Sequence, residues 1–337
     1  MLFLALETSC DETAAAVFTD EPRVLANVVA SQTEKHLPFG GVVPEIAARA
    51  HLQNILPVIE EALTRAGVTL NQIDAIAVHH TPGLVGALLI GVSAAKMLSL
   101  ALDKPLLAVN HVASHIYACR LAAGRDIFPC VGLVVSGGHT ALFQCPSPLK
   151  MNLLGGTRDD AAGEAFDKVG AILGLGFPGG PALEREASIG NPTAYNFPRS
   201  FLHDDRIEFS FSGLKTAVLY TIHGKGVSKG PTPQPGPLRS DVAASFQQAV
   251  IDVLVAKSHL AIRQTGLRRL AVGGGVTANK KLRSALEEMT TRYGIELFIP
   301  PMNLCTDNAA MAALAVEKWR LGEFAALDLD AEPNWLE

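Results

Sequence analysis

One arrangement of residues occurs twice in this sequence and constrains the fold more than any other feature. An apolar strand over residues 2–6 leads into a polar turn at 7–13, and a second apolar strand follows at 14–18. Residues 129–145 repeat this order of strand, polar turn and strand. Each predicted hairpin opens a block in which helical and strand-like patterns alternate. The sequence therefore predicts a duplicated α/β fold with two lobes.

Length and charge are consistent with such a fold. A chain of 337 residues, of which 48% are hydrophobic and 18% charged, is long enough for two well-packed domains. The formal net charge of −5 argues against a protein whose whole surface binds nucleic acid. A polynucleotide partner would need a local basic patch or help from a second subunit.

The cysteines and the apolar segments predict a cytoplasmic protein. The five cysteines are odd in number and include no Cys-x-x-Cys pair, which suits a reducing compartment. The apolar residues 1–6 have no basic flank and run into Glu7, unlike a signal peptide. The uncharged stretch at 75–95 contains a Pro-Gly turn, so we interpret it as a strand and a buried helix rather than a membrane span.

A pair of histidines is the first candidate for a functional site. Residues 105–109 predict a strand, and Asn110 is a good N-cap for the helix that would follow. His111 and His115 are one helical turn apart, so their Cβ atoms should lie about 5–6 Å from each other on one face. Two imidazoles so placed can bind one metal ion. Because ten histidines also produce such spacings by chance, a purely structural pair stays open.

Three polar turns follow predicted strands, at residues 7–13, 136–140 and 273–279. In a two-lobed fold all three can face the cleft between the lobes, where main-chain N–H groups would bind the phosphates of a nucleotide. Asp307 comes just before the last predicted helix, and it either caps that helix or turns toward the histidines. In the second case, two imidazoles and one carboxylate would form a site for a catalytic divalent metal.

Nine motifs of this chain occur in the order found in one known family. They lie at residues 7–13, 40–45, 111–115, 135–140, 159–168, 177–181, 209–216, 273–279 and 305–308. With these motifs the chain resembles, over residues 1–320, the bacterial tRNA N6-adenosine threonylcarbamoyltransferases of the TsaD type, formerly called the O-sialoglycoprotein endopeptidase family.

The resemblance implies the two-lobed α/β fold shared by actin, sugar kinases and heat-shock ATPases, with the active site in the cleft between the lobes. We expect a first lobe at residues 1–110, onto which 305–325 folds back. The second lobe would cover 111–304 and include the histidine helix at the lobe junction. Residues 326–337 would form a loosely held acidic tail.

The implied activity is transfer of a threonylcarbamoyl group from threonylcarbamoyl-adenylate to N6 of the adenosine 3′ of the anticodon, in tRNAs that read codons beginning with A. AMP is the other product. The implied partners are tRNA, a paralogous subunit of the same fold and a small ATPase subunit. A homodimer is also open, and no membrane is involved.

The resemblance also assigns site residues, position by position. Its metal ligands fall on His111, His115 and Asp307, for one divalent ion per subunit, with Fe²⁺ favoured over Zn²⁺. Its adenylate contacts fall on Val134, Val135, Ser136, Gly137, Gly138, Asp167, Gly180, Glu184 and Asn279. Many members have Asp in place of Glu184, and the 223–237 loop is longer and richer in proline than usual. No general base is assigned, and Asp11 and Glu12 are the candidates.

Three other functions fit parts of the pattern. A zinc peptidase would have Glu directly after the first histidine, where this chain has Val112. A kinase of the same fold would need a catalytic Asp, for which Asp11 or Asp167 is available, but it would not explain the histidines. A non-catalytic subunit of the same fold would not need the metal-type residues.

The basic run at 268–283 is either a tRNA-binding patch or a solvated surface.

Overall fold

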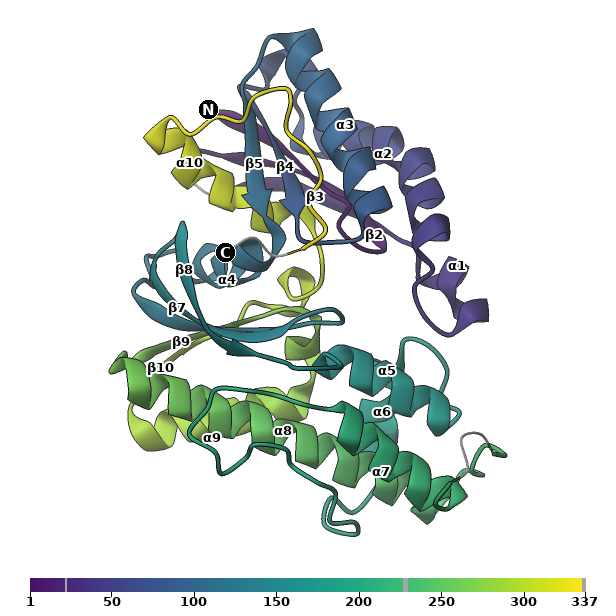
Figure 1. Cartoon of the computed structure of the whole chain (residues 1–337). Helices are drawn as coiled ribbons and strands as arrows, with labels where there is room; N and C mark the ends of the chain where they lie inside the picture. The colour runs from purple at the N-terminus through teal and green to yellow at the C-terminus, as the bar shows by residue number, and fades with distance from the viewer. Residues whose placement is uncertain (22, 227–229, 335–337) are drawn as a thin grey trace. The chain divides into compact units, whose positions relative to one another are not determined.

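The computed structural model describes residues 1–21, 23–226 and 230–334 (Figure 1). Residues 227–229 of the proline-rich loop and 335–337 of the predicted tail lie outside the described residues. The chain divides into two compact units. Unit 1 comprises Met1–Asp126, Ser147–Lys150 and the chain from Pro300 onward, and unit 2 comprises Ile127–Pro146 and Met151–Ile299.

Unit 1 is built on a five-stranded sheet in the order β3-β2-β1-β4-β5. The strands are β1 (Leu2–Glu7), β2 (Glu12–Thr19), β3 (Val24–Ser31), β4 (Ala75–Thr81) and β5 (Leu106–Asn110). β1, β2 and β3 are antiparallel neighbours, whereas β4 and β5 run parallel to β1. β1 and β2 form the first predicted hairpin, with Leu2 opposite Thr19.

Each face of this sheet has its own apolar core, because side chains alternate along a strand. The helical segments of the unit are α1 (Thr33–His36), η1 (Leu37–Phe39), α2 (Pro44–Ala66), η2 (Leu70–Gln72), α3 (Val85–Leu102), α4 (His111–Ala123), η4 (Met302–Leu304), η5 (Ala309–Leu314) and α10 (Ala315–Leu321). Leu4 and Leu6 pack in one cluster with residues of α2 and α3. Phe3 and Ala5 pack in another with Tyr117 of α4 and with η5. Figure 1 accordingly shows α2 and α3 on one side of the sheet and α10 on the other.

The apolar helix α3 is a covering helix of this sheet. By length and composition it is the one helix among the described residues that could cross a membrane. However, Ala87 and Val92 are buried in the unit, and a Cβ on Gly91 would collide with Thr8 Oγ1. Thr8 Oγ1 also donates a hydrogen bond to Ala87 O at 2.9 Å. The predicted strand and buried helix within residues 75–95 are therefore confirmed as β4 and the first half of α3.

Unit 2 repeats the design with a second five-stranded sheet, in the order β10-β9-β6-β7-β8. Its strands are β6 (Cys130–Val135), β7 (Thr140–Ser147), β8 (Lys150–Gly156), β9 (Arg269–Gly273) and β10 (Glu296–Phe298). Its helical segments are α5 (Ala162–Ile172), α6 (Gly179–Ala187), α7 (Ser212–His223), α8 (Pro237–Thr265), η3 (Gly275–Ala278) and α9 (Lys280–Tyr293). Phe166 of α5 and Phe246 of α8 meet in its single large apolar cluster, with ring centroids 5.3 Å apart.

The two sheets have the same topology. In unit 1, β1 pairs antiparallel with β2 and parallel with β4, and β4 pairs parallel with β5. In unit 2, β6 pairs antiparallel with β7 and parallel with β9, and β9 pairs parallel with β10. β6 and β7 form the second predicted hairpin, with Val135 opposite Thr140. The predicted duplication of an α/β unit is therefore confirmed.

The predicted division at residue 110 differs from the two units. The sequence places the histidine helix in the second lobe, whereas α4 belongs to unit 1, which runs to Asp126. The reason is packing, since Tyr117 of α4 is fully buried in the same cluster as Phe3 and Leu314. Unit 1 also contains residues 305–325.

The segment before the chain end is attached to unit 1 more firmly than predicted. Glu332 N donates a hydrogen bond to His80 O at 2.8 Å, next to the end of β4. Gly83 N donates to Pro333 O at 3.2 Å. Residues 326–334 are therefore held by main-chain hydrogen bonds and do not form a loose tail.

Candidate metal centre and phosphate-binding turns

Three parallel strands of unit 1 bring their carboxyl ends to one edge of the sheet. β1 ends at Glu7, β4 carries His79 near its end, and β5 ends at Asn110. The Asn110 side chain accepts a hydrogen bond from Ala113 N at 3.0 Å, which confirms the predicted N-cap and begins α4 at His111. The fold therefore gathers a carboxylate and two imidazoles at this edge.

His111 and His115 face a common point together with Asp307. The centroids of the two imidazole rings are 4.6 Å apart. Asp307 Oδ1 lies 3.6 Å from His111 Nε2 and 3.3 Å from His115 Nε2. Both histidines are nearly inaccessible to solvent, at 4% and 1% exposure. The three residues assigned as metal ligands thus form one buried cluster.

Asp307 can face the histidines because its neighbour caps the following segment. Asn308 Oδ1 accepts a hydrogen bond from Ala310 N at 3.1 Å at the start of η5. The alternative in which Asp307 is the cap is therefore wrong. An adjacent Asn satisfies the free N–H group, which leaves the Asp307 carboxylate for the imidazoles.

The donor set of this cluster fits a divalent transition metal. The ligand atoms of His111, His115 and Asp307 lie within 4.8 Å of one another. Within the described residues, neither ring nitrogen of His115 forms a hydrogen bond, and Nε2 has only the ion-pair contact with Asp307. Buried polar atoms without a partner cost free energy, which a bound ion would recover at Nε2. Two imidazoles and one carboxylate suit Fe²⁺ or Zn²⁺.

The charges of the cluster shift the pKa values of its members. Burial alone would lower the pKa of His111, but the carboxylates of Asp307 and Glu7 raise it to about 9. Burial would raise the pKa of Asp307, whereas its attraction to His111 and His115 lowers it. Burial also lowers the pKa of His115. The metal-free cluster therefore holds a proton on His111 at neutral pH, and metal binding would release it.

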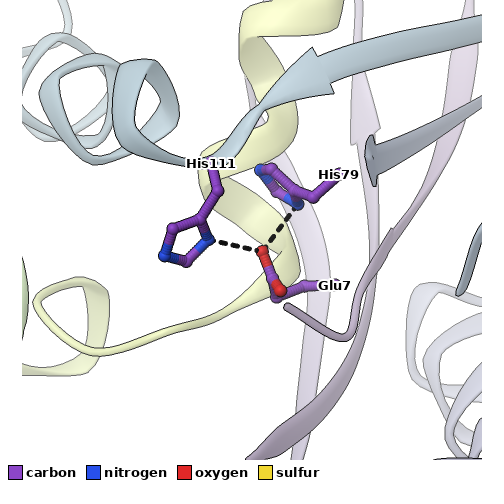
Figure 2. Close-up of side chains that lie close together, drawn as sticks. All are labelled: Glu7, His79 and His111. Carbon is purple, nitrogen blue, oxygen red and sulfur yellow. Dashed lines mark hydrogen bonds and ion pairs between the residues drawn. The ribbon is translucent and has the colours of Figure 1, made fainter. Parts of the chain in front are cut away.

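Figure 2 shows a second layer of polar side chains, in which the Glu7 carboxylate lies between His79 and His111. Glu7 Oε2 is 2.8 Å from His79 Nδ1 and 3.0 Å from His111 Nδ1. Burial would raise the pKa of Glu7, but attraction to the two imidazoles holds it well below its ordinary value. The sequence alone identifies neither Glu7 nor His79 as functional. The feature that could have identified them is their position, because each lies at or near the end of a strand that runs parallel to β5.

The two candidate bases lie beside the turn between β1 and β2. Glu12 Oε1 accepts a hydrogen bond from Ser31 Oγ at 3.2 Å. Burial, together with the nearby carboxylates of Asp11 and Asp307, raises the pKa of Glu12 to about 9. A carboxyl group with such a pKa is protonated at neutral pH, so Glu12 is suited to donate a proton or a hydrogen bond.

The residues assigned to adenylate binding all belong to unit 2. They are Val134, Val135, Ser136, Gly137, Gly138, Asp167, Gly180, Glu184 and Asn279. In the turn after β6, Ser136 N donates to His139 O at 2.8 Å, and His139 N donates to Ser136 Oγ at 3.1 Å. These bonds fix the turn while Gly137 and Gly138 stay exposed.

The two glycine turns of unit 2 pack against each other. Gly274, with a φ of +97°, follows β9, and a Cβ there would collide with Val135 O. On the other side, a Cβ on Gly163 of α5 would come within 2.6 Å of Ser136 O. The ends of β6 and β9 and the start of α5 therefore approach more closely than side chains would allow.

Asp167 contacts Gly179, the neighbour of Gly180, at the start of α6. Asp167 Oδ1 accepts a hydrogen bond from Gly179 N at 2.8 Å. A Cβ on Gly179 would come within 2.6 Å of Asp167 Cα, so glycine is required for this approach. The carboxylate therefore fixes the position of the α6 N-terminus, where the N–H groups of a helix can bind an anion.

Glu184 and Asn279 both hold the start of α9. Asn279 is its N-cap, because its Oδ1 accepts from Leu282 N at 2.9 Å. Glu184 Oε1 accepts from Lys280 N at 2.7 Å. The structure thus gives both residues a structural contact and brings α6, α9 and the end of β9 together.

Two residues of the basic run at 268–283 have partners within unit 2. Arg269 pairs with Glu296 at 3.2 Å, and Arg283 Nε donates to Thr277 O at 2.6 Å. The other basic residues of the run are exposed; they are Arg268, Lys280 and Lys281. A tRNA-binding patch and a solvated surface both stay open for this run.

Comparison with known proteins identifies the family of the chain. The sequence profile of the tRNA N6-adenosine threonylcarbamoyltransferases matches residues 23–314. A protein of that name from Rhodopirellula baltica is 52% identical over 348 residues, covering 99% of this chain and 96% of that protein. One from Symbiobacterium thermophilum is 53% identical over 334 residues, with coverage of 99% and 96%.

Solved structures of lower sequence identity share the fold. Full-length HypF in a phosphate- and nucleotide-bound form has a TM-score of 0.63 at 15% identity, covering 98% of this chain and 56% of that one. Component A of the Acidaminococcus fermentans (R)-2-hydroxyglutaryl-CoA dehydratase has a TM-score of 0.55 at 16% identity, covering 94% and 98%. The fold is that of the actin-like ATPases and kinases. With its sequence match over most of its length and an intact histidine–aspartate cluster, the chain belongs to the tRNA N6-adenosine threonylcarbamoyltransferase family.

Proposed function

We propose that this chain transfers the threonylcarbamoyl group of threonylcarbamoyl-adenylate to N6 of the adenosine 3′ of the anticodon, in tRNAs that read codons beginning with A. AMP is the second product. The observation that carries this function is the match over 98–99% of the chain, at about half identity, to proteins named for this reaction. The buried cluster of His111, His115 and Asp307 supports it, because the metal-type residues are present and converge.

His111, His115 and Asp307 would hold one divalent ion per chain, with Fe²⁺ favoured and Zn²⁺ as the alternative. When bound, such an ion supplies a Lewis acid that polarises an acyl or phosphoryl oxygen. The protein's contribution is to aim the ligands and to keep Asp307 and His115 deprotonated. The lowered pKa values of Asp307 and His115 support this role, since both groups are already in their metal-binding forms at neutral pH.

Unit 2 would bind the adenylate. The exposed N–H groups of Gly137 and Gly138 can donate to the phosphate oxygens and to developing negative charge. Gly180, in the first turn of α6, offers a further N–H donor at a helix N-terminus that Asp167 holds in place. In the proposed reaction the exocyclic amine of adenosine attacks the carbamoyl carbon, the bond from that carbon to the phosphate oxygen breaks, and AMP leaves.

The proton of the attacking amine has two candidate acceptors, Asp11 and Glu12. The raised pKa of Glu12 favours a hydrogen-bonding or proton-donating role for this residue. The proposed reaction needs the metal ligands of unit 1 and the turns of unit 2 to act on one substrate.

The proposed partners are tRNA, a paralogous subunit of the same fold and a small ATPase subunit, with a homodimer as a further assembly and the cytoplasm as the compartment. The net charge of −5 supports shared binding of tRNA by several subunits. Large apolar side chains are exposed on α2 and α3, including Leu52 and Leu56 at 67% and Met97 and Leu100 at 64%. Exposed apolar groups of this kind support a protein–protein contact on unit 1.

The test is to supply the purified chain and its partner subunits with threonylcarbamoyl-adenylate and substrate tRNA, and to measure threonylcarbamoyladenosine by nucleoside mass spectrometry. The proposal expects product with the wild type and none with His111→Ala. The exposed His203 provides the matched control, and His203→Ala should retain activity. Peptide cleavage without modified nucleoside would instead support the peptidase alternative.

A further inference from the structure

Behind the proposed metal ligands lies a fully buried pair, Glu7 and His79, to which the proposed function gives no role. Glu7 ends β1, and His79 lies near the end of β4, the strand between β1 and β5; α4 begins at the end of β5. Figure 2 shows the Glu7 carboxylate pointing at both imidazoles. A carboxylate with no solvent access must have a reason for its position, because burial without partners is costly.

The contacts of Glu7 are all with nitrogen atoms. Its Oε2 accepts a hydrogen bond from His111 Nδ1 at 3.0 Å and forms an ion-pair contact with His79 Nδ1 at 2.8 Å. Its Oε1 accepts from Ser9 N. Glu7 is thus an acceptor in each of these contacts, and His111 Nδ1 must donate to it.

This hydrogen bond determines which nitrogen of His111 is available to a metal. A neutral imidazole carries one proton, and when His111 gives up its second proton to bind a metal, Glu7 retains the other on Nδ1. The lone pair then lies on Nε2, the atom 3.6 Å from Asp307 Oδ1. Because the bond also restrains rotation of the ring, Nε2 is aimed at the point shared with His115 and Asp307.

His79 extends this arrangement to the helix that carries both histidine ligands. Its Nε2 lies 2.8 Å from Ser114 Oγ, and Ser114 Oγ donates to Asn110 O at 2.9 Å. His79 therefore connects the Glu7 carboxylate to the first turn of α4. A shift of Glu7 away from His111 would have to break this second contact as well.

Glu7, His79 and His111 could also be interpreted as a second metal site. Their spacing argues against it, since tetrahedral ligands at about 2.0–2.1 Å from an ion lie about 3.3 Å apart, farther than the 2.8 and 3.0 Å found here. The 3.0 Å contact with His111 is a charge-assisted hydrogen bond, and the 2.8 Å contact with His79 is an ion pair.

We propose that Glu7 and His79 are positioning residues that hold His111 in the Nδ1-protonated form, with Nε2 aimed at the metal. The proposal rests on the proposed metal site and adds the residues that prepare it. Hydrogen-bond partners of metal-bound histidines contribute about 10–100-fold to metal affinity. Removing the Glu7 carboxylate should therefore weaken metal binding without removing a ligand.

The test measures the affinity of the metal-free full chain for Zn²⁺ and Fe²⁺, by competition with a chromophoric chelator, with the thermal unfolding of each metal-free variant recorded alongside. Glu7→Gln should bind Zn²⁺ about 10–100-fold more weakly than the wild type. Glu7→Asp keeps the charge, and its Zn²⁺ affinity should lie between those of the wild type and Glu7→Gln. The control is His36→Gln, which removes a fully buried histidine bonded to Gln32 and Val43 instead, and its affinity should equal that of the wild type.

His79→Asn provides a second variant in case Glu7→Gln does not fold, and it should lower the affinity about tenfold. X-ray absorption of zinc-loaded Glu7→Gln should show a less ordered imidazole shell than the wild type. Wild-type affinity in both folded variants would overturn the inference while leaving the proposed function intact. Failure of the wild type to bind metal at the His111–His115–Asp307 cluster would overturn both.

Discussion

His115 Nε2 lies 3.3 Å from Asp307 Oδ1, although one residue sits on a helix early in the chain and the other near its end. The contact exists because η5 and α4 pack in one apolar cluster on the same face of the first sheet. The convergence of the proposed metal ligands is thus a direct consequence of how the core of unit 1 packs.

The first prediction concerns this carboxylate. Asp307→Asn keeps the shape of the side chain but removes the charge that the metal and the His111 imidazolium both need. We expect metal affinity to fall at least 100-fold, beyond the range for residues that only support a ligand, and activity to fall with it. Chelator competition and nucleoside mass spectrometry measure the two effects. Asp328→Asn, at an exposed position, should change neither.

The second prediction is a pH dependence of the metal-free chain. The pKa of His111 is raised from 6.5 to about 9 in the folded state. The contribution of its protonation to the free energy of unfolding is therefore fully present below pH 6.5 and is lost as the pH rises through 9. The loss is at most about 3 kcal/mol. Between pH 6.5 and 9, urea unfolding should show a larger fall in the free energy of unfolding for the wild type than for His111→Gln. Parallel pH profiles of the two proteins would contradict the assignment.

The third prediction distinguishes the proposed adenylate contacts of unit 2 from the proposed metal ligands of unit 1. Asp167→Ala removes the acceptor for Gly179 N and loosens the start of α6. A hydrogen bond to a charged group contributes about 1.5–3 kcal/mol, so AMP binding should weaken about tenfold or more while Zn²⁺ affinity stays unchanged. Isothermal titration of both ligands makes the comparison. Glu164→Ala, on the same helix but paired with Lys168, is the matched control and should bind AMP normally.

The fourth prediction tests the close approach of α3 to the first turn. Gly91→Ala places a Cβ against Thr8 Oγ1, so the helix must shift, at a cost of about 1–3 kcal/mol in unfolding free energy. In Gly86→Ala on the same helix, the new Cβ meets Ala48 at 3.4 Å, an ordinary contact. That variant should be neutral or slightly more stable, since Ala favours helix over Gly. Equal effects of the two substitutions on the unfolding free energy would show that contact with Thr8 does not decide the cost.

Local patterns explain which features could be predicted from the sequence. The two hairpins, the Asn110 cap and the histidine spacing depend on residues close together in the chain, and each is confirmed. The sequence assigns the histidine helix to the second lobe, whereas α4 belongs to unit 1, because the burial of Tyr117 in one cluster with Phe3 is a long-range contact with no local signal. The roles of Glu7 and His79 depend on the order of parallel strands, which the sequence of one strand does not specify. Asp307 and Asn308 are both good caps, and only packing decides which of them serves.

The most direct test of the central claim is a metal titration of the chelator-treated chain, with modified tRNA measured at each point in the presence of the partner subunits. If His111, His115 and Asp307 hold the ion that the transfer needs, product formation will rise in proportion to occupancy and saturate at one ion per chain. His115→Ala will then neither bind the ion nor form product. Full activity of the metal-free chain, or of His115→Ala, would contradict the claim.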